Sequence, residues 1–370
     1  MKRQMMATFV LSLAAAIPAR AEEKAKPGQV DVVFCIDRSG SMDQVIDTAK
    51  QKIWAIVNDI AKVRPTPVLR IGLIGYGSAN NDYRFFQLTD DLDGVYANLM
   101  TFKTDMGGDE WVGAVVKKAT TEMKWSANKE ALRMIFTVGN ETAMQGSEDL
   151  LYPKTVPEAI KADIVVNAIY CGRPNADEER TWREVAKLAD GSYTTIDISG
   201  GAITIATPMD EEMAKLNEAL NKTYVAYGRR GKDGQKAQEE QDKNSTDNGG
   251  ASNGAQRAEA KSSGVYNNSS WDMVDACKGK DFRIEDVKDE DLPENMRKMT
   301  MDERKAHIAA MKAEREKIQK EVQAKAVERQ KYIDAEIKSK GLTQDKAFDE
   351  AVRRMVREQA EKKGFEVGKE

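Results

Sequence analysis

The residues best suited to chemistry follow an apolar run near the start of the chain. Asp37, Ser39 and Ser41 alternate along a short turn that follows the strand-like run Val30–Ile36, and a helix-like apolar stripe comes next. In an open parallel α/β sheet, such a turn lies at the carboxyl end of a strand, where these folds bind ligands. One carboxylate and two hydroxyls that point to the same place suit a hard divalent cation.

The same turn also has a purely structural interpretation. The segment Ser41-Met42-Asp43-Gln44 fits a helix capping box. In that case Ser41 would accept hydrogen bonds from the first backbone N–H groups of the helix. The turn by itself leaves cap and cation ligand open.

Two further loops supply oxygen atoms. Asp109 lies just before a predicted helix, and Asn140 and Glu141 follow the strand-like run Leu132–Val138. If the first strand is central, loops after neighbouring strands meet at one sheet edge. Structural alternatives are a helix N-cap for Asp109 and a turn residue for Asn140. The expected metal ligands are therefore Asp37, Ser39, Ser41 and Asp109, with Asn140 or Glu141 from the third loop.

Several kinds of catalytic site have no counterpart in the sequence. The single histidine, His307, lies in a charged segment near the end of the chain. This excludes histidine triads and histidine-ligated zinc in the first two hundred residues. No Gly-x-Ser-x-Gly elbow or phosphate-binding glycine loop is present. We therefore expect that the chain is not an enzyme.

The cysteines do not form the pattern of a disulfide framework. There are three, and Cys35 and Cys171 each lie in an apolar strand-like run. Such positions favour buried free thiols. The state of Cys277 is not predicted by its surroundings.

Residues 1–21 resemble a secretory signal. Lys2 and Arg3 precede the apolar run Met5–Ile17, and small residues flank Arg20. We expect an exported protein, periplasmic or secreted. No later segment is apolar enough for a transmembrane helix, so an integral membrane protein is not expected. The formal net charge of −4 argues against binding to nucleic acid or to anionic membranes.

Residues 22–228 alternate between strand-like runs and helical patterns. This order predicts one α/β domain with a doubly wound, mostly parallel, Rossmann-like sheet covered by helices on both faces. The run Tyr83–Leu88 follows its neighbour after a short polar loop and should form an antiparallel edge strand. The strand-like runs are Gln29–Ile36, Val68–Tyr76, Tyr83–Leu88, Leu132–Val138, Ile164–Tyr170 and Ser192–Ile196.

Residues 229–270 differ sharply from this domain. They are rich in Lys, Gln, Asn, Gly and Ser and contain few large apolar side chains. Such a segment buries too little apolar surface to offset the entropy of ordering. We therefore predict a polar linker that is helical in part at most.

Residues 271–370 read as a charged helical tail. A capping box at Thr300 should open a long helix that ends at Lys340, before Gly341. A shorter helix is expected over residues 343–363.

The long helix lacks a clean coiled-coil heptad. Continuing the a/d register from Ile308 and Met311 places Arg315, Lys325 and Arg329 on the seam. This favours a solvated helix held by i,i+4 ion pairs. A partner-binding or self-associating arm is the alternative.

Several segments carry a resemblance to a known family. Asp37–Met42 resembles the first motif of the metal-ion-dependent adhesion site (MIDAS) of von Willebrand factor A (VWA) domains, and the order of elements through Ile196 fits that fold. Segments such as Gly107–Gly113, Val138–Glu141 and Val165–Gly172 are similar to a bacterial group of exported VWA proteins. The likeness extends into the charged tail.

The resemblance implies Asp37, Ser39 and Ser41 as first-loop ligands. Asp109 falls where the family's second loop has a Thr, and Gly139 or Asn140 falls where the third loop has an Asp. The first motif is therefore intact, whereas the second and third depart from the family's pattern.

These features together predict an exported binding protein. Its VWA domain would hold a divalent cation, with Mg²⁺ preferred and Mn²⁺ or Ca²⁺ as alternatives. An acidic side chain of a protein partner would complete the metal shell. One alternative is a metal-assisted hydrolase in which Asp109 or Glu141 acts as general base. Another is a scaffold of an envelope assembly that acts through the helical tail.

Overall fold

The computed structural model describes residues 28–77, 82–105, 107–172, 176–196, 204–341 and 348–367. Its sheet has the strand order β3-β2-β1-β4-β5-β6. The β2–β3 pair is antiparallel and the other pairs are parallel. This confirms the predicted doubly wound sheet with one antiparallel edge strand. The strands are β1 (Gln29–Asp37), β2 (Val68–Tyr76), β3 (Arg84–Thr89), β4 (Leu132–Gly139), β5 (Val165–Cys171) and β6 (Tyr193–Ile196).

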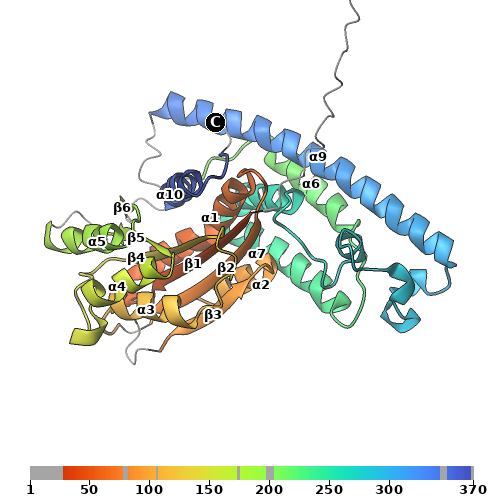
Figure 1. Cartoon of the computed structure of the whole chain (residues 1–370). Coiled ribbons are helices and arrows are strands. Elements are labelled where there is room, and N and C mark those ends of the chain that lie inside the picture. The colour runs from red at the N-terminus through yellow and green to blue at the C-terminus, as the bar shows by residue number, and fades with distance from the viewer. Residues whose placement is uncertain are drawn as a thin grey trace, which may run out of the picture.

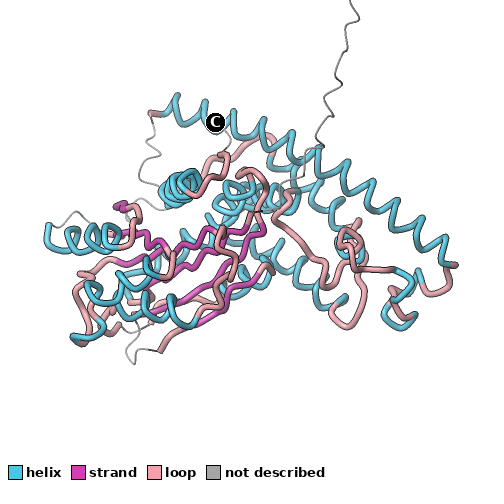
Figure 2. Tube along the Cα trace, in the orientation of Figure 1, coloured by secondary structure: helices cyan, strands magenta, loops and turns pink. Residues whose placement is uncertain are grey.

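Helices cover both faces of this sheet, as Figure 2 shows. Successive residues of a strand point to opposite faces. Phe34 accordingly packs in a core with α1 and α2, while Val33 and Cys35 pack in a second core with α3, α4 and α5. Cys35 and Cys171 are buried free thiols, as predicted, and Cys277 is exposed. The helices are α1 (Asp43–Ala61), α2 (Leu92–Met100), α3 (Val112–Glu122), α4 (Tyr152–Lys161), α5 (Ala176–Leu188) and α6 (Asp210–Asn221).

The segment expected to be a polar linker is a helix. α7 spans Gly231–Ser262 and bends at Gly250, where φ is 66°. It packs against α1, α6 and α9, so the linker prediction is wrong. The composition misled because α7 buries many polar side chains and, among apolar ones, only alanines. Those buried in α7 are Gln238, Gln241, Ser245, Ser252, Asn253, Arg257, Lys261 and Ser262.

Asp242 explains how α7 tolerates this burial. Its carboxylate accepts hydrogen bonds from Arg257 Nε at 2.5 Å and from Lys261 Nζ at 2.9 Å. Asn217 and Asn221 of α6 donate to it at 2.8 and 2.7 Å. Buried polar groups are stable when they are paired in this way, so the contacts of Asp242 hold α7 against α6.

The charged tail folds back on the domain. α9 spans Met301–Lys340, opens with the predicted capping box at Thr300 and ends at Gly341, where φ is 60°. It runs past α6 and α7 along one side of the molecule (Figure 1). The short α8 (Met273–Ala276) also packs against it. The expectation of a solvated helix is therefore wrong. The side chains of α9 that are buried are Arg304, Ile308, Arg315, Ile318, Val322, Ala326 and Arg329.

The buried face of α9 follows the seven-residue register, although this register places arginines on the seam. Ile308, Arg315, Val322 and Arg329 recur every seven residues, and all four are buried. Arg329 donates to Asp210 at 2.8 Å. The arginines can lie on the seam because each donates hydrogen bonds to buried acceptors there. The interpretation as a solvated helix did not include such acceptors.

The last helix, α10 (Phe348–Lys362), reaches the edge of the sheet where the parallel strands begin. The ring of Phe365 packs on Gly28, just before β1. Lys363 pairs with Asp163, just before β5, at 3.0 Å. The C-terminal segment therefore packs against the edge of the sheet at which the parallel strands begin. The predicted metal loops lie at the opposite edge, where those strands end.

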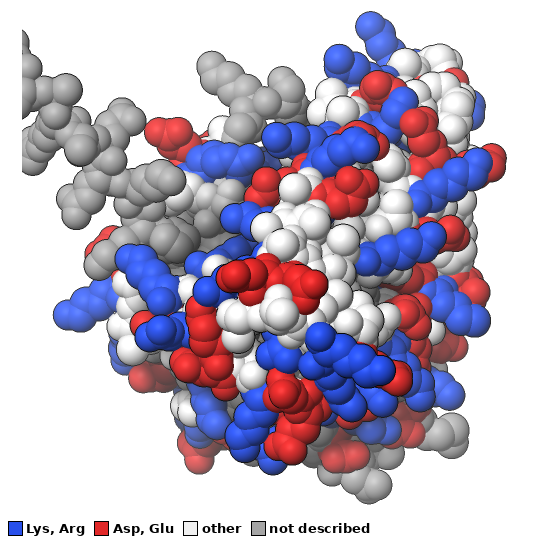
Figure 3. All heavy atoms as spheres, turned by 90° about the vertical axis from the view of Figure 1, so that its right-hand side faces the viewer, with Lys and Arg blue, Asp and Glu red and all other residues white. Residues whose placement is uncertain are grey.

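Short 3₁₀ helices complete the described elements. Those between α8 and α9 form, with both helices, a small third core that contains Val225, Met273 and Met296. On the face at this end of the molecule, acidic and basic side chains are interspersed (Figure 3). Within the described residues, no helix is long and apolar enough to span a bilayer. The 3₁₀ helices are η1 (Gly40–Met42), η2 (Glu148–Leu150), η4 (Ile284–Asp286), η5 (Asp289–Asp291) and η6 (Glu294–Met296).

Candidate metal centre

The first loop brings its three predicted residues together at the carboxyl end of β1. Asp37 is the last residue of that strand and is fully buried. The Ser39 backbone N–H donates to Asp37 Oδ1 at 2.7 Å, and Ser39 Oγ donates to Asp37 Oδ2 at 3.0 Å. The Oγ atoms of Ser39 and Ser41 lie 3.1 Å apart. The loop therefore presents one carboxylate and two hydroxyls around one point.

The competing interpretation of this turn as a capping box is wrong. Ser41 lies inside η1, and α1 has Met42 at its N-cap position, with no side-chain capping bond. The hydroxyl of Ser41 instead accepts a hydrogen bond from Asn140 Nδ2 at 2.8 Å. The serines of this loop therefore face the neighbouring loop and not the backbone N–H groups of the helix.

The third loop contributes Asn140 but not Glu141. Asn140 follows β4 directly, and its Oδ1 is buried without a hydrogen-bond partner. Glu141 is exposed, and its carboxylate accepts from Gln145 Nε2 at 2.8 Å. Its backbone oxygen is held by Trp182 Nε1 at 2.6 Å. Of these two predicted ligands, the structure brings only the amide to the first loop.

The second loop contributes Glu110 and not the predicted Asp109. Asp109 is exposed, and its carboxylate accepts from Trp111 Nε1 at 3.2 Å. Glu110 is 2% exposed and lies beside Asp37. Its backbone N–H donates to Gln145 Oε1 at 2.7 Å, which fixes the direction of this turn. The sequence offers two adjacent acids, and only the packing of the loop decides which one faces inward.

The two buried carboxyls, Asp37 and Glu110, disfavour each other's ionisation. Burial, and then the negative charge of Asp37, raises the pKa of Glu110 to about 9. Burial also raises the pKa of Asp37. Two neighbouring carboxylates do not both ionise readily unless a positive charge lies between them. Positive charge at this place would therefore stabilise both carboxylates.

These residues fit a divalent cation. They offer two carboxylates, two hydroxyls and one amide oxygen, which are the ligands that Mg²⁺ and Ca²⁺ prefer. Glu110 Oε2 and Asn140 Oδ1 are buried acceptors that lack a donor, and a cation would satisfy both. Within the described residues, no group of three or more acidic, histidine or cysteine side chains is placed to hold a metal ion. Any cation here would depend on neutral oxygens as well.

Residues 32–141 match the family model of the von Willebrand factor type A domain. The chain contains a VWA domain. The matched segment includes all three loops of the candidate site and ends at Glu141. The sheet of the VWA domain continues beyond it, through β5 and β6.

Several solved structures are similar to this VWA domain. BatB, a conserved hypothetical protein from Bacteroides thetaiotaomicron, is 18% identical over 45% of this chain and 90% of its own, with a TM-score of 0.37. A von Willebrand factor type A protein from Catenulispora acidiphila is 14% identical over 47% of this chain and 40% of its own, with a TM-score of 0.38.

Proximal thread matrix protein 1 of the mussel byssus, with a zinc-occupied MIDAS motif, is 15% identical over 47% of this chain and 43% of its own, with a TM-score of 0.38. This chain thus spans less than half the length of the last two proteins. No curated protein matches the chain.

Gly77 makes room for the buried acids of the VWA domain. Its φ is +78°, and a Cβ there would lie 2.2 Å from Asp37 Oδ1. The substitution Gly77→Ala should displace the Asp37 carboxylate, lower the free energy of unfolding by about 1–3 kcal/mol and abolish any stabilisation by Mg²⁺. Urea titration with and without Mg²⁺ measures both effects.

Gly228→Ala is the matched control for this substitution. Gly228 also has a positive φ, of +68°, but no atom lies within 4 Å of its Cβ position. It should therefore show only the backbone cost and keep the response to Mg²⁺. A Gly77→Ala protein that responds to Mg²⁺ as the Gly228→Ala protein does would contradict the assignment of Asp37 to the site.

Proposed function

We propose that this chain is a non-catalytic binding protein whose VWA domain recognises a protein partner in a cation-dependent way. The observation that carries the proposal is the meeting of Asp37, Ser39, Ser41, Glu110 and Asn140 at the carboxyl edge of the sheet. A bound Mg²⁺ would supply positive charge and coordination positions for water or for a ligand. Mn²⁺ and Ca²⁺ accept the same oxygens.

The residues at this edge have different roles in the proposed site. Asp37 and Glu110 would contact the cation through their carboxylates, while Ser39, Ser41 and Asn140 would add neutral oxygens. The bond from Ser39 N–H holds the Asp37 carboxylate in place. The C-terminal segment contacts the opposite edge of the sheet, where Lys363 pairs with Asp163.

The hydrolase alternative loses support from the same geometry. It required Asp109 or Glu141 as general base next to a metal-bound water. Both carboxylates are exposed, and they accept hydrogen bonds from Trp111 and Gln145. A general base needs to reach the reacting proton within hydrogen-bond distance. The arrangement therefore favours binding over hydrolysis.

The scaffold alternative also loses its main feature. It relied on a free helical tail, whereas α9 buries seven side chains against its own chain.

We propose that the protein lies outside the cytoplasm, periplasmic or secreted, because of the signal-like residues 1–21, which lie outside the described part of the chain. Export would be tested by the size and the compartment of the mature protein.

Cation binding predicts a shift in thermal stability. A ligand that binds only the folded state at a hundred times its Kd adds about 2.7 kcal/mol to the free energy of unfolding. Saturating Mg²⁺ should therefore raise the Tm of the full chain by several degrees relative to EDTA. Asp37→Ala and Glu110→Gln should remove the shift.

Asp109→Asn is the control that separates the two acids of the second loop. Because Asp109 points to Trp111 and not to Asp37, this variant should keep the full Mg²⁺ shift. Loss of the shift in Asp109→Asn together with its retention in Glu110→Gln would overturn the ligand set. A shift of the same size in Asp37→Ala would show that the cation binds elsewhere.

Partner binding itself is tested by affinity capture. Tagged full-length protein should retain a specific envelope protein in Mg²⁺ and release it in EDTA. The Asp37→Ala protein should retain it in neither buffer. Equal capture by both proteins in both buffers would contradict cation-dependent binding.

The sequence suggested that the partner offers an acidic side chain to the cation. That interaction requires positive charge to remain at the cation after the protein's own ligands are bound. With Asp109 outside the site and Glu110 within it, two buried carboxylates take part. The predicted ligands offered up to three carboxylates, Asp37, Asp109 and Glu141, so the two that lie together leave no less positive charge for an acidic partner.

A further inference from the structure

We propose that Trp182 and Thr181, neighbouring residues of α5, are positioning residues for the cation site. They act through the third loop, whose backbone they hold so that Asn140 presents its amide oxygen toward the first loop. The proposal rests on the cation site proposed above and adds residues that set its affinity. Neither residue stands out in the sequence, because Trp182 lies 41 residues and Thr181 38 residues beyond its partner in the loop.

The third loop is held by hydrogen bonds to its backbone on both sides of Asn140. Before it, Tyr76 Oη donates to the carbonyl oxygen of Val138 at 3.1 Å. After it, Trp182 Nε1 donates to the carbonyl oxygen of Glu141 at 2.6 Å. Both donor side chains are buried. Asn140 therefore lies between two carbonyl groups whose directions are fixed by side chains of other elements.

Thr181 holds the end of the same loop. Its Oγ1 accepts a hydrogen bond from the backbone N–H of Ala143 at 3.0 Å. The same hydroxyl donates to the carbonyl oxygen of Glu178, one turn earlier in α5, at 2.7 Å. Thr181 and Ala143 are both buried. The hydroxyl thus joins the backbone of the third loop to the backbone of the helix.

The ring of Trp182 is in close contact with the start of the loop. A Cβ at Gly139 would lie 3.0 Å from Trp182 Cη2 and 2.8 Å from Tyr76 Oη. On another side the ring packs near Tyr170, with 6.3 Å between the ring centres. Close-packed interiors transmit small displacements. A change at Trp182 should therefore move the backbone next to Asn140.

Asn140 depends on this support more than the ligands of the first loop do. The Asp37 carboxylate is held by Ser39, a neighbour in the same turn. Asn140 Nδ2 donates to Ser41 Oγ at 2.8 Å, and within the described residues its buried Oδ1 has no partner. The loop backbone therefore sets the direction of that oxygen. Residues that orient a metal ligand typically contribute roughly 10–100-fold to metal affinity.

The test measures the Kd of the full-length protein for Mg²⁺ by isothermal titration calorimetry. Trp182→Phe keeps an aromatic ring but removes the indole N–H, so the carbonyl group of Glu141 loses its donor. We expect the Kd to rise about tenfold. Thr181→Val keeps the shape of the side chain without the hydroxyl and should also raise the Kd. Thr181→Ser keeps the hydroxyl and should retain the Kd of the wild type.

Trp125→Phe is the matched control. Trp125 Nε1 also donates to a backbone carbonyl group, that of Ala119, at 2.9 Å. It lies near the other edge of the sheet, since the adjacent Ser126 bonds to Gln29 at the start of β1. This variant loses the same kind of hydrogen bond and should keep the Kd of the wild type. An equal rise in Kd for Trp125→Phe and Trp182→Phe would reflect general destabilisation and overturn the proposal.

The remaining outcomes separate this proposal from the proposed function. Circular dichroism establishes that each variant is folded, and Thr181→Val decides the matter if Trp182→Phe does not fold. An unchanged Kd in the folded variants would overturn the positioning role while the cation site stands. A Thr181→Ser protein that binds as weakly as Thr181→Val would count against it equally. Failure of the wild type to bind Mg²⁺ would refute the cation site, and the positioning role with it.

Discussion

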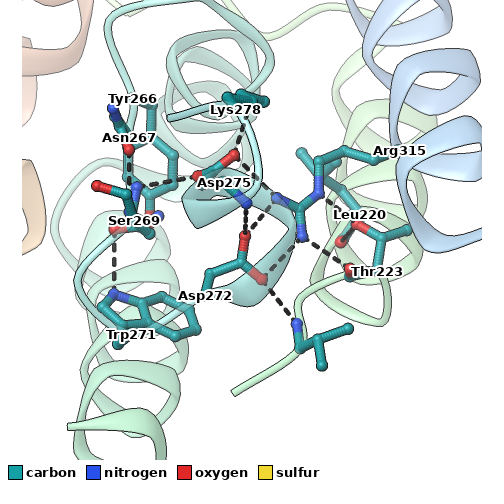
Figure 4. A network of polar contacts seen from close by, with 12 residues as sticks. Leu220, Thr223, Tyr266, Asn267, Ser269, Trp271, Asp272, Asp275, Lys278 and Arg315 are labelled. Carbon is teal, nitrogen blue, oxygen red and sulfur yellow. Dashed lines mark hydrogen bonds and ion pairs between the residues drawn. The ribbon is translucent and has the colours of Figure 1, made fainter. Parts of the chain in front are cut away.

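Replacing Arg315 with alanine should lower the free energy of unfolding by about 3–5 kcal/mol, because it would leave the buried carboxylate of Asp272 without its cation and that of Asp275 with Lys278 alone. Arg315 is 2% exposed, and Asp272 and Asp275 are 0% and 3% exposed. Arg315 reaches from α9 to both acids, as Figure 4 shows. The expected loss is a large fraction of the total stability of an ordinary domain.

The geometry at Arg315 explains why the loss is large. Nη1 donates to Asp272 at 2.6 Å and to Asp275 at 3.1 Å. Nη2 donates to Asp272 at 3.1 Å and to the Thr223 carbonyl oxygen at 2.7 Å, and Nε donates to Thr223 Oγ1 at 3.0 Å. The guanidinium also lies 3.9 Å from the ring centre of Tyr224. All of its donors are thus engaged by one set of buried groups.

Two further variants test whether the charge and the shape of Arg315 cause the loss. Arg315→Lys keeps the charge but not the planar fork, so it should recover only part of the stability. Lys317→Ala, at an exposed position two residues along the same helix, should barely change the unfolding midpoint. Urea titration followed by circular dichroism compares the three. Similar midpoints for Arg315→Ala and Lys317→Ala would refute the docking of α9 through this arginine.

The substitution Asp242→Asn should be as costly, by about 3–5 kcal/mol, since it keeps the shape of the side chain but removes its charge. Arg257 and Lys261 are both fully buried, and Asp242 pairs with each of them. Without the carboxylate, Lys261 would keep only its bond to the amide oxygen of Asn221, and Arg257 would keep Asp93, at 2.9 Å, as its acidic partner. Helix α7 should then lose its packing against α6.

The pH dependence of this variant follows from the pKa of Asp242. Burial alone would raise that pKa, but the charges of Arg257 and Lys261 outweigh burial and hold it below its usual value. A carboxyl with a lower pKa when folded stabilises the protein above its unfolded pKa of about 4 and loses this contribution as the pH falls. The gap between wild type and Asp242→Asn should therefore be full at neutral pH and shrink below about pH 4.

Asp247→Asn is the control on the same helix. Asp247 pairs with Lys243 at the surface, where such pairs contribute little. Its unfolding midpoint should match the wild type at every pH. An Asp242→Asn protein that behaves in the same way would show that α7 is not held by its buried charges.

The local pattern of the chain was enough to predict most of the fold. Apolar runs that alternate with helical stripes predicted the parallel sheet, and the short loop before Tyr83 predicted the antiparallel edge strand β3. The capping box at Thr300 and the stop at Gly341 were confirmed at both ends of α9. The helix α2 was not predicted, although Asp91 caps it by accepting from Gly94 N–H at 3.0 Å.

The polar segments were misjudged for a common reason. Composition measures how much apolar surface a segment can bury, and it does not show whether polar side chains will find partners. Lys261 bonds to Asp242 across the bend of α7 at Gly250, and Arg329 bonds to Asp210 far away in the chain. Such pairing depends on neighbours that only the folded chain provides.

The sequence by itself determined the order of the strands, most of the helices between them and the first loop, Asp37 to Ser41, because these depend on residues close together in the chain. Only the tertiary structure decided that Glu110 and Asn140 face this loop while Asp109 and Glu141 point outward. The choice between adjacent acids depends on which way a loop packs, here fixed by the bond from Glu110 N–H to Gln145 at 2.7 Å. That contact joins two loops that are far apart in the sequence, so no local pattern could predict it.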